Sequence, residues 1–117
     1  MIYFRINKTL FEWVIENLIK NAIDSMNGKG TIEINVIKTN SNVQVEIRDS
    51  GKGILKENLK KIFNPGFSLK KKGWGLGLSL SKRIINLYHG GKIYVKESKI
   101  NSGSILVIRL PLFIESS

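Results

Sequence analysis

The order of the regular segments constrains the fold of this sequence most, because helical and strand-like patterns follow one another without a fixed alternation. Apolar residues recur in pairs over residues 8–26, which predicts one long helix that begins after Asn7. Residues 31–38 and 43–48 then alternate between apolar and polar side chains, which predicts a hairpin. A helix followed directly by a hairpin is unlike the regular strand-helix repeat of doubly wound folds.

The second half of the sequence adds further segments of both kinds. Helical spacing is found at residues 56–62 and 76–88, and alternation at residues 3–6, 92–97 and 104–110. Residues 64–75 have neither period and predict a loop. We therefore expect an α+β two-layer sandwich, in which a mixed, mostly antiparallel sheet of about five strands carries three helices on one face.

The composition predicts a single domain over residues 1–117. With 117 residues and 42% hydrophobic content, the chain can build a core without disulfides, and it has no cysteines. No apolar run approaches the roughly 20 residues that span a bilayer. We expect a cytoplasmic domain without membrane contact of its own, although the full-length protein could be membrane-anchored through other segments.

The formal charge of +10 comes from 19 Lys and Arg against 9 Asp and Glu. This excess favours anionic partners such as nucleotide phosphates, nucleic acid or acidic proteins. The basic residues are spread over the chain, and the one tight cluster, residues 70–72, borders a glycine-rich loop instead of aromatic strand positions. We therefore expect no nucleic-acid partner. A nucleic-acid-binding module would instead bind DNA with a steep salt dependence.

A polar stripe of Asn17, Asn21 and Asp24 follows one face of the first predicted helix. Asparagine is disfavoured inside helices because its amide competes for backbone hydrogen bonds. The stripe is therefore either a solvated face or part of a site. In a site, an amide oxygen suits Mg²⁺, which takes few protein ligands beside phosphate oxygens, and Asn21 is the candidate ligand.

The glycine-bearing segment at residues 49–54, Asp-Ser-Gly-Lys-Gly-Ile, follows a predicted strand. One interpretation is an ordinary turn. The other is an adenine site, in which Asp49 accepts a hydrogen bond from the exocyclic amine and Gly53, which lacks Cβ, lets the flat ring approach the backbone.

A second glycine-bearing segment at residues 73–78, Gly-Trp-Gly-Leu-Gly-Leu, opens a predicted helix. Exposed amides and the dipole at a helix start bind phosphate. Its spacing does not fit a Rossmann or P-loop motif. The neighbouring Lys70, Lys71 and Lys72 are either a solvated run or contacts to terminal phosphates.

These segments, in this order, resemble the sequence boxes of the catalytic and ATP-binding domain of bacterial sensor histidine kinases, which has the Bergerat fold of the gyrase, chaperone and mismatch-repair ATPases. Residues 17–22 are similar to the N box, 49–54 to the first glycine box, 62–67 to the phenylalanine box and 73–78 to the second glycine box. Gly103-Ser104 and Leu110-Pro111 resemble the family's terminal Gly-Thr and Leu-Pro signature. The similarity covers nearly the whole chain.

The resemblance implies a site for ATP and Mg²⁺, with Asn21 as the metal ligand and Asp49 reading the adenine amine. The residues expected to contact the nucleotide are Asn17, Asn21, Asp49, Gly51, Gly53, Ile54, Phe63, Gly73, Gly75, Leu76, Gly77, Leu78 and Ser104. With the lysines already named, the candidate catalytic residues are Asn17, Lys70, Lys71 and Lys72.

The implied function is donation of the γ-phosphoryl group of ATP to a histidine on a dimerisation domain of the same or a partner kinase, and so indirectly to a response regulator. The single histidine, His89, precedes two glycines in a turn-like context, and we do not expect it to be the acceptor. We accordingly expect no dimerisation or phosphoacceptor domain within residues 1–117.

Two related functions remain open. A gyrase- or chaperone-type ATPase shares the fold but usually has a glutamate where Asn17 stands, and an anti-sigma-type serine kinase is a single domain of similar length. The sequence departs from many family members at Asp24-Ser25, where a basic and an aromatic residue are usual, and at Ser104, where threonine is usual. Any contact that depends on the usual pair at positions 24 and 25 is therefore open.

Overall fold

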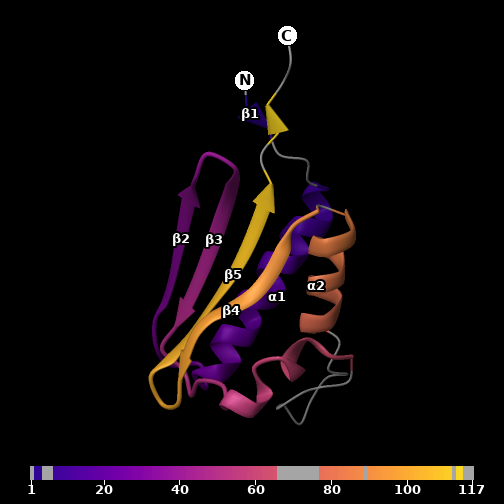
Figure 1. Cartoon of the computed structure of the whole chain (residues 1–117). Coiled ribbons are helices and arrows are strands. Elements are labelled where there is room, and N and C mark those ends of the chain that lie inside the picture. Colours follow the sequence, from indigo (N-terminus) through magenta and orange to yellow (C-terminus); the bar gives the residue numbers. More distant parts are fainter. Residues whose placement is uncertain (1, 4–6, 66–76, 89, 112, 115–117) are drawn as a thin grey trace.

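The computed structural model of the chain describes residues 2–3, 7–65, 77–88, 90–111 and 113–114. Figure 1 shows one sheet whose strands run side by side, with the helices gathered behind it. The predictions for residues 66–76 and for His89 lie outside the described residues.

The main sheet has four antiparallel strands in the order β2-β3-β5-β4. Their bounds are β2 Ile32–Lys38, β3 Asn42–Asp49, β4 Lys92–Lys99 and β5 Gly103–Pro111. Strand β4 contains a bulge, because the register with β5 shifts by one residue between Val95 and Glu97 and leaves Lys96 as an extra residue. The predicted hairpin and both later strands are therefore confirmed.

A separate two-stranded sheet pairs the two ends of the described chain. Strand β1, Ile2–Tyr3, lies antiparallel to β6, Phe113–Ile114. Of the expected fifth strand at residues 3–6, Tyr3 belongs to this separate sheet, and residues 4–6 lie outside the described residues. Every described strand pair is antiparallel. Pro111 ends β5, as expected for a residue with no N–H to donate to a ladder.

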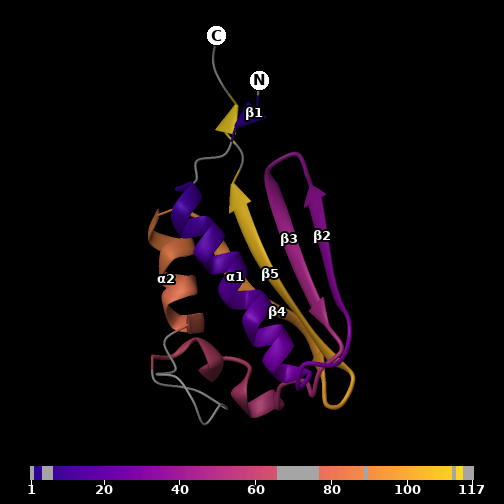
Figure 2. The ribbon, with the colours of Figure 1, turned by 180° about the vertical axis from the view of Figure 1, so that it is seen from behind.

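Two α-helices cover one face of the main sheet, as Figure 2 shows: α1, Lys8–Ser25, and α2, Gly77–Tyr88. Helix α1 begins where predicted, because the Asn7 side chain caps it by accepting a hydrogen bond from the Leu10 N–H at 3.1 Å. The third predicted helix is instead two 3₁₀ helices, η1 Lys56–Asn58 and η2 Lys61–Phe63. So short a segment gains too few backbone bonds to propagate an α-helix.

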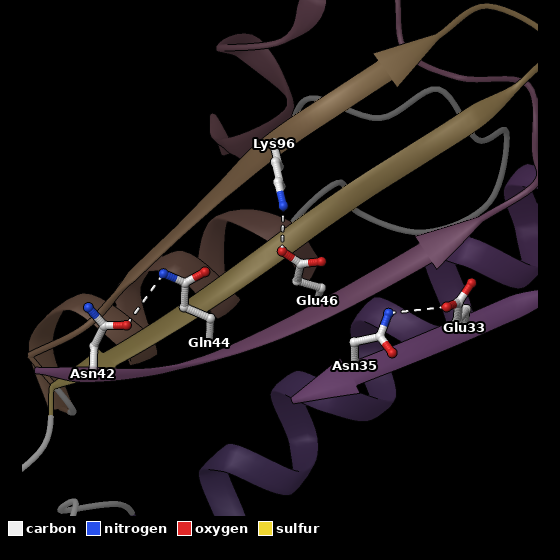
Figure 3. A network of polar contacts seen from close by, with 6 residues as sticks. All are labelled: Glu33, Asn35, Asn42, Gln44, Glu46 and Lys96. Carbon is white, nitrogen blue, oxygen red and sulfur yellow. Dashed lines mark hydrogen bonds and ion pairs between the residues drawn. The ribbon is translucent and has the colours of Figure 1, made fainter. Parts of the chain in front are cut away.

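The core lies between the helices and the sheet. It is formed by the buried residues Val14, Leu18, Val45, Ile47, Ile84, Ile85, Ile93, Ile108 and Leu110. On this covered face of the sheet, the side chains of β3 are apolar up to the last residue of the strand, which is polar. The opposite, open face carries polar contacts (Figure 3), including an ion pair of 2.7 Å between Lys96 Nζ and Glu46 Oε2. The predicted two-layer α+β class is confirmed.

Candidate nucleotide-binding site

Most of the predicted site residues that the structure describes lie at one end of the molecule. In Figure 1 the end of α1, the end of β3, the turn between β4 and β5, the two 3₁₀ helices and the start of α2 all meet at the lower end. This arrangement brings segments together that are far apart in the sequence. The residues there form two groups, one around Asp49 and one around Asn17.

Asp49 is the buried acid at the end of β3, with 7% of its surface exposed. Its Oδ1 accepts a hydrogen bond of 2.9 Å from the Gly51 N–H. Burial raises the pKa of Asp49 above its usual 3.8, and hydrogen bonds from the backbone N–H groups of Gly51 and Ser104 act in the opposite direction. The carboxylate is thus held in place by backbone donors, and among the described residues no lysine or arginine forms an ion pair with it.

The loop after Asp49 is bonded to its neighbours on both sides. The Lys52 N–H donates to the Ser25 carbonyl at 3.3 Å, and the Asn101 N–H donates to the Lys52 carbonyl at 2.8 Å. A Cβ at Gly51 would collide with the Ser25 side chain. The loop is therefore fixed between the end of α1 and the β4–β5 turn.

Gly53 is required by the fold itself. Its φ is +76°, a conformation that favours glycine, and a Cβ there would collide with the backbone carbonyl of Lys99. From the sequence, we expect this glycine to give a flat ring access to the backbone. The contact with Lys99 is a sufficient reason in the folded chain, and the approach of a ring stays a prediction.

Ser98, which is not among the predicted site residues, joins this group from β4. The Ile54 N–H donates to Ser98 Oγ at 2.8 Å, and Ser98 Oγ lies 2.8 Å from Ser104 Oγ. Ser104 is also the register partner of Asp49. The predicted residues Asp49, Gly51, Ile54 and Ser104 therefore belong to one hydrogen-bonded cluster that holds the loop.

Asn17 forms the second group where α1 meets the start of α2. Its Nδ2 donates to Ser81 Oγ at 3.1 Å, and Ser81 is fully buried. A Cβ at Gly77 would lie 2.6 Å from Asn17 Oδ1, so a larger residue there would displace the Asn17 side chain. Asn17 therefore serves a helix contact and does not lie on a solvated face. Asn21 follows one turn later and is half-buried, whereas Asp24 is exposed.

The remaining predicted residues are placed only in part. Gly77 and Leu78 are the first two residues of α2, and Phe63 ends η2. Phe63 packs against the core, and Lys82 Nζ lies 5.4 Å from its ring centroid. Those that lie outside the described residues are Lys70, Lys71, Lys72, Gly73, Gly75 and Leu76.

A cavity of about 220 Å³ near this end is not the predicted site. Its walls include Glu33, Arg48 and Glu97, and exposed Arg48 alternates with buried Asp49 along β3. The cavity therefore opens on the face of the sheet away from the helices. It shares Asp49 and Ser104 as a boundary with the predicted site.

The fold and the two polar groups define an α+β domain of the histidine-kinase catalytic type. The family model described as histidine kinase-, DNA gyrase B-, and HSP90-like ATPase matches residues 7–114. The chain therefore belongs to this family, and the resemblance predicted from its sequence boxes is confirmed.

Individual relatives agree with this assignment. The chain is 43% identical to the adaptive-response sensory kinase SasA of Gloeothece citriformis, over 92% of this chain and 28% of that protein. It is 39% identical to sporulation kinase C of Bacillus subtilis, over 88% of this chain and 24% of that protein. The chain thus spans 24–28% of the length of these two curated relatives.

Solved structures of kinase domains have the same fold. The catalytic domain of histidine kinase ThkA superposes with a TM-score of 0.79 at 37% identity, covering 90% of this chain and 69% of that one. The mycobacterial sensor histidine kinase MprB gives a TM-score of 0.83 at 22% identity, over 96% of this chain and 78% of that one, and supports the fold alone.

Proposed function

We propose that this chain binds ATP with Mg²⁺ and donates the γ-phosphoryl group to a histidine on a separate dimerisation domain. The observation that carries the proposal is Asp49, a buried carboxylate that is held by backbone N–H groups and has no cationic partner among the described residues. Family membership over residues 7–114 supports ATP as the ligand.

The base would be selected by what Asp49 can accept. An ionised carboxylate only accepts hydrogen bonds, so it is complementary to the exocyclic amine of adenine and not to the carbonyl oxygen at the same position of guanine. Burial strengthens this choice, because an unmatched polar group in a site shielded from water costs more than in solvent. Adenine should therefore be preferred over guanine.

The phosphates and the metal would lie toward α1 and α2. The amide oxygen of Asn21 suits Mg²⁺, which binds oxygen ligands and keeps several waters. The N–H groups of Gly77 and Leu78 are at the start of α2, where the helix dipole favours anions. Lys70, Lys71, Lys72, Gly73, Gly75 and Leu76 remain proposed phosphate contacts, although they lie outside the described residues.

In the proposed transfer, a nitrogen of the acceptor histidine attacks the γ-phosphorus, the bond to the bridging oxygen breaks, and ADP leaves. This chain contributes mainly positioning and charge neutralisation. The acceptor would be on a dimerisation domain of the same or a partner kinase, with a response regulator as the indirect partner. Within the described residues, no helix has the length and apolar character to cross a bilayer. We propose a cytoplasmic position for the domain.

Rapid hydrolysis of ATP is not part of the proposal. Hydrolysis needs a group that orients or deprotonates water, and the Asn17 amide cannot take up a proton at neutral pH. Its amide nitrogen is also bonded to Ser81. A related ATPase or an anti-sigma-type serine kinase would need a general base for its reaction. None of the contacts described above supplies one.

The test uses γ-labelled ATP with Mg²⁺ and the cognate dimerisation domain. We expect acid-labile label on the added domain, none on this chain alone, and slow phosphate release. His89→Ala serves as the matched control and should change nothing. Label on this chain that His89→Ala abolishes would contradict the proposal, and brisk phosphate release without the added domain would favour the ATPase.

A further inference from the structure

Two serine hydroxyls meet beside the Asp49 carboxylate on the covered face of the sheet. Ser98 of β4 and Ser104 of β5 are register partners, and their Oγ atoms lie 2.8 Å apart. Ser104 is 5% exposed and pairs in turn with Asp49 of β3. One row across three strands therefore reads Asp49, Ser104, Ser98.

The contacts of Ser98 determine how the two hydroxyl protons are used. The Ile54 N–H occupies one lone pair of Ser98 Oγ at 2.8 Å, so Ser98 is an acceptor there. Its own single proton has two acceptors in reach, Ser104 Oγ at 2.8 Å and the Gly103 carbonyl at 3.5 Å. The shorter contact is the better hydrogen bond. Either serine can be the donor in this contact. In the arrangement proposed below, Ser98 donates to Ser104, and the Ser104 proton is directed elsewhere.

We propose that Ser98 is a positioning residue that directs the Ser104 hydroxyl as a donor next to the Asp49 acceptor. The inference rests on the proposed function and deepens it to recognition of two adjacent atoms of the base. Adenine presents an amine donor beside the N1 acceptor, which matches an acceptor and a donor in this order. Hypoxanthine and guanine present a carbonyl oxygen beside an N1–H donor, and they mismatch both protein groups.

The same serine also holds the loop that follows Asp49. Because the Ile54 N–H donates to Ser98, the far end of residues 49–54 is attached to β4. Loss of the Ser98 hydroxyl therefore has two effects. It removes the hydrogen bond from the Ile54 N–H, and it leaves the Ser104 proton free to rotate. Only the second effect depends on the hydrogen-bonding pattern of the base, and this dependence separates positioning from simple structural support.

The test measures binding of ATP and of ITP, which carries hypoxanthine, by calorimetry. Ser98→Ala should weaken ATP about tenfold, the size of one lost hydrogen bond, and leave ITP nearly unchanged, so that the preference for ATP falls by about the same factor. Ser98→Thr keeps the oxygen and should retain affinity and preference within about twofold. Ser102→Ala removes an exposed hydroxyl from the adjacent turn and should change neither.

An equal loss for ATP and ITP in Ser98→Ala would overturn the inference, since a structural role alone predicts it, and so would no change in either. If Ser98→Ala fails to fold, Ser98→Cys gives the same comparison, because a thiol is a weak donor and acceptor. A parent protein that binds no ATP would remove the proposed function as well. ATP binding that Asp49→Asn abolishes and Ser98→Ala leaves untouched would remove this inference alone.

Discussion

Strand β3 carries two buried carboxylates on opposite faces of the sheet, and the two have different partners. Glu46 and Asp49 are each 7% exposed. Glu46, on the open face, is paired with the Lys96 ammonium at 2.7 Å. Asp49, on the covered face, is held only by backbone N–H groups among the described residues.

The difference shows which buried acid is available to a ligand. A buried charge is costly unless it is paired, and Lys96 meets that need for Glu46. Two backbone N–H groups hold Asp49, and a carboxylate can accept about four hydrogen bonds, so acceptor capacity remains. An acid that keeps this capacity at the end of a sheet is a candidate site residue, whereas a paired acid of equal burial is a structural one.

The largest effect should come from Asp49→Asn, which keeps the shape of the side chain and removes its charge. ATP binding should weaken about 100-fold, because a hydrogen bond to a charged group is lost and the new amide presents donors to the adenine amine. Glu46→Gln is the matched control and should bind ATP as the parent does. Calorimetry measures both, and equal affinities in the two variants would abolish the distinction between the acids.

A smaller effect should come from Lys96→Met, which leaves Glu46 buried without its partner. The free energy of unfolding should fall by about 1 kcal/mol, a modest value because the Lys96 side chain is 52% exposed and its pairing is partly screened by solvent. Urea unfolding measures it. Lys92→Met, the same change at an exposed position of β4, should cost less than about 0.5 kcal/mol. A loss of ATP affinity in Lys96→Met would place Glu46 in the site.

The smallest effect concerns the pH dependence of stability in the protein without nucleotide. Burial raises the pKa of Asp49 in the folded state, so the folded chain binds this proton more tightly than the unfolded chain does. The contribution of Asp49 to stability therefore grows as the pH falls through the raised pKa toward 3.8, and it is lost at higher pH. Relative to Asp49→Asn, the parent should gain stability between neutral pH and that range.

Urea unfolding of both proteins across this pH series is the measurement, because groups common to both cancel in the difference. A difference that stays constant with pH would show that Asp49 titrates alike in the folded and unfolded chains. A slope of the opposite sign would mean that the backbone hydrogen bonds from Gly51 and Ser104 outweigh burial.

Much of the fold could be predicted from the sequence because its signals are local. The pairs of apolar residues in α1, the Asn7 cap and the alternation in β2 and β3 each depend on neighbours within a few residues. The 3₁₀ helices and the separate β1–β6 sheet were missed. The sheet depends on a pairing between distant residues that no short window contains, whereas residues 56–62 are too few to propagate the α-helix that their spacing predicts.

The residues of the site also divide into those with local sequence signals and those that depend on long-range contacts. Asp49 and Gly51 could be selected because an acid and a glycine directly after a strand form a local pattern. Ser81 could not, because its bond to Asn17 joins residues 64 positions apart. Ser98 stands in an alternating strand whose phase changes at a bulge, so the sequence did not reveal which face it occupies.

The bulge at Lys96 shifts the register of strand β4 against β5 by one residue. Before it Val95 lies opposite Leu106, and after it Glu97 lies opposite Ile105 and Ser98 opposite Ser104. If β4 continued past Val95 without a bulge, Lys96 would lie opposite Ile105, and Glu97 would lie opposite Ser104 on the covered face, near Asp49. Two carboxylates would then share one buried corner and compete for a single proton. Whether Lys96 bulges out of the ladder or pairs within it thus decides whether this corner of the sheet is lined by hydroxyls or by a second acid.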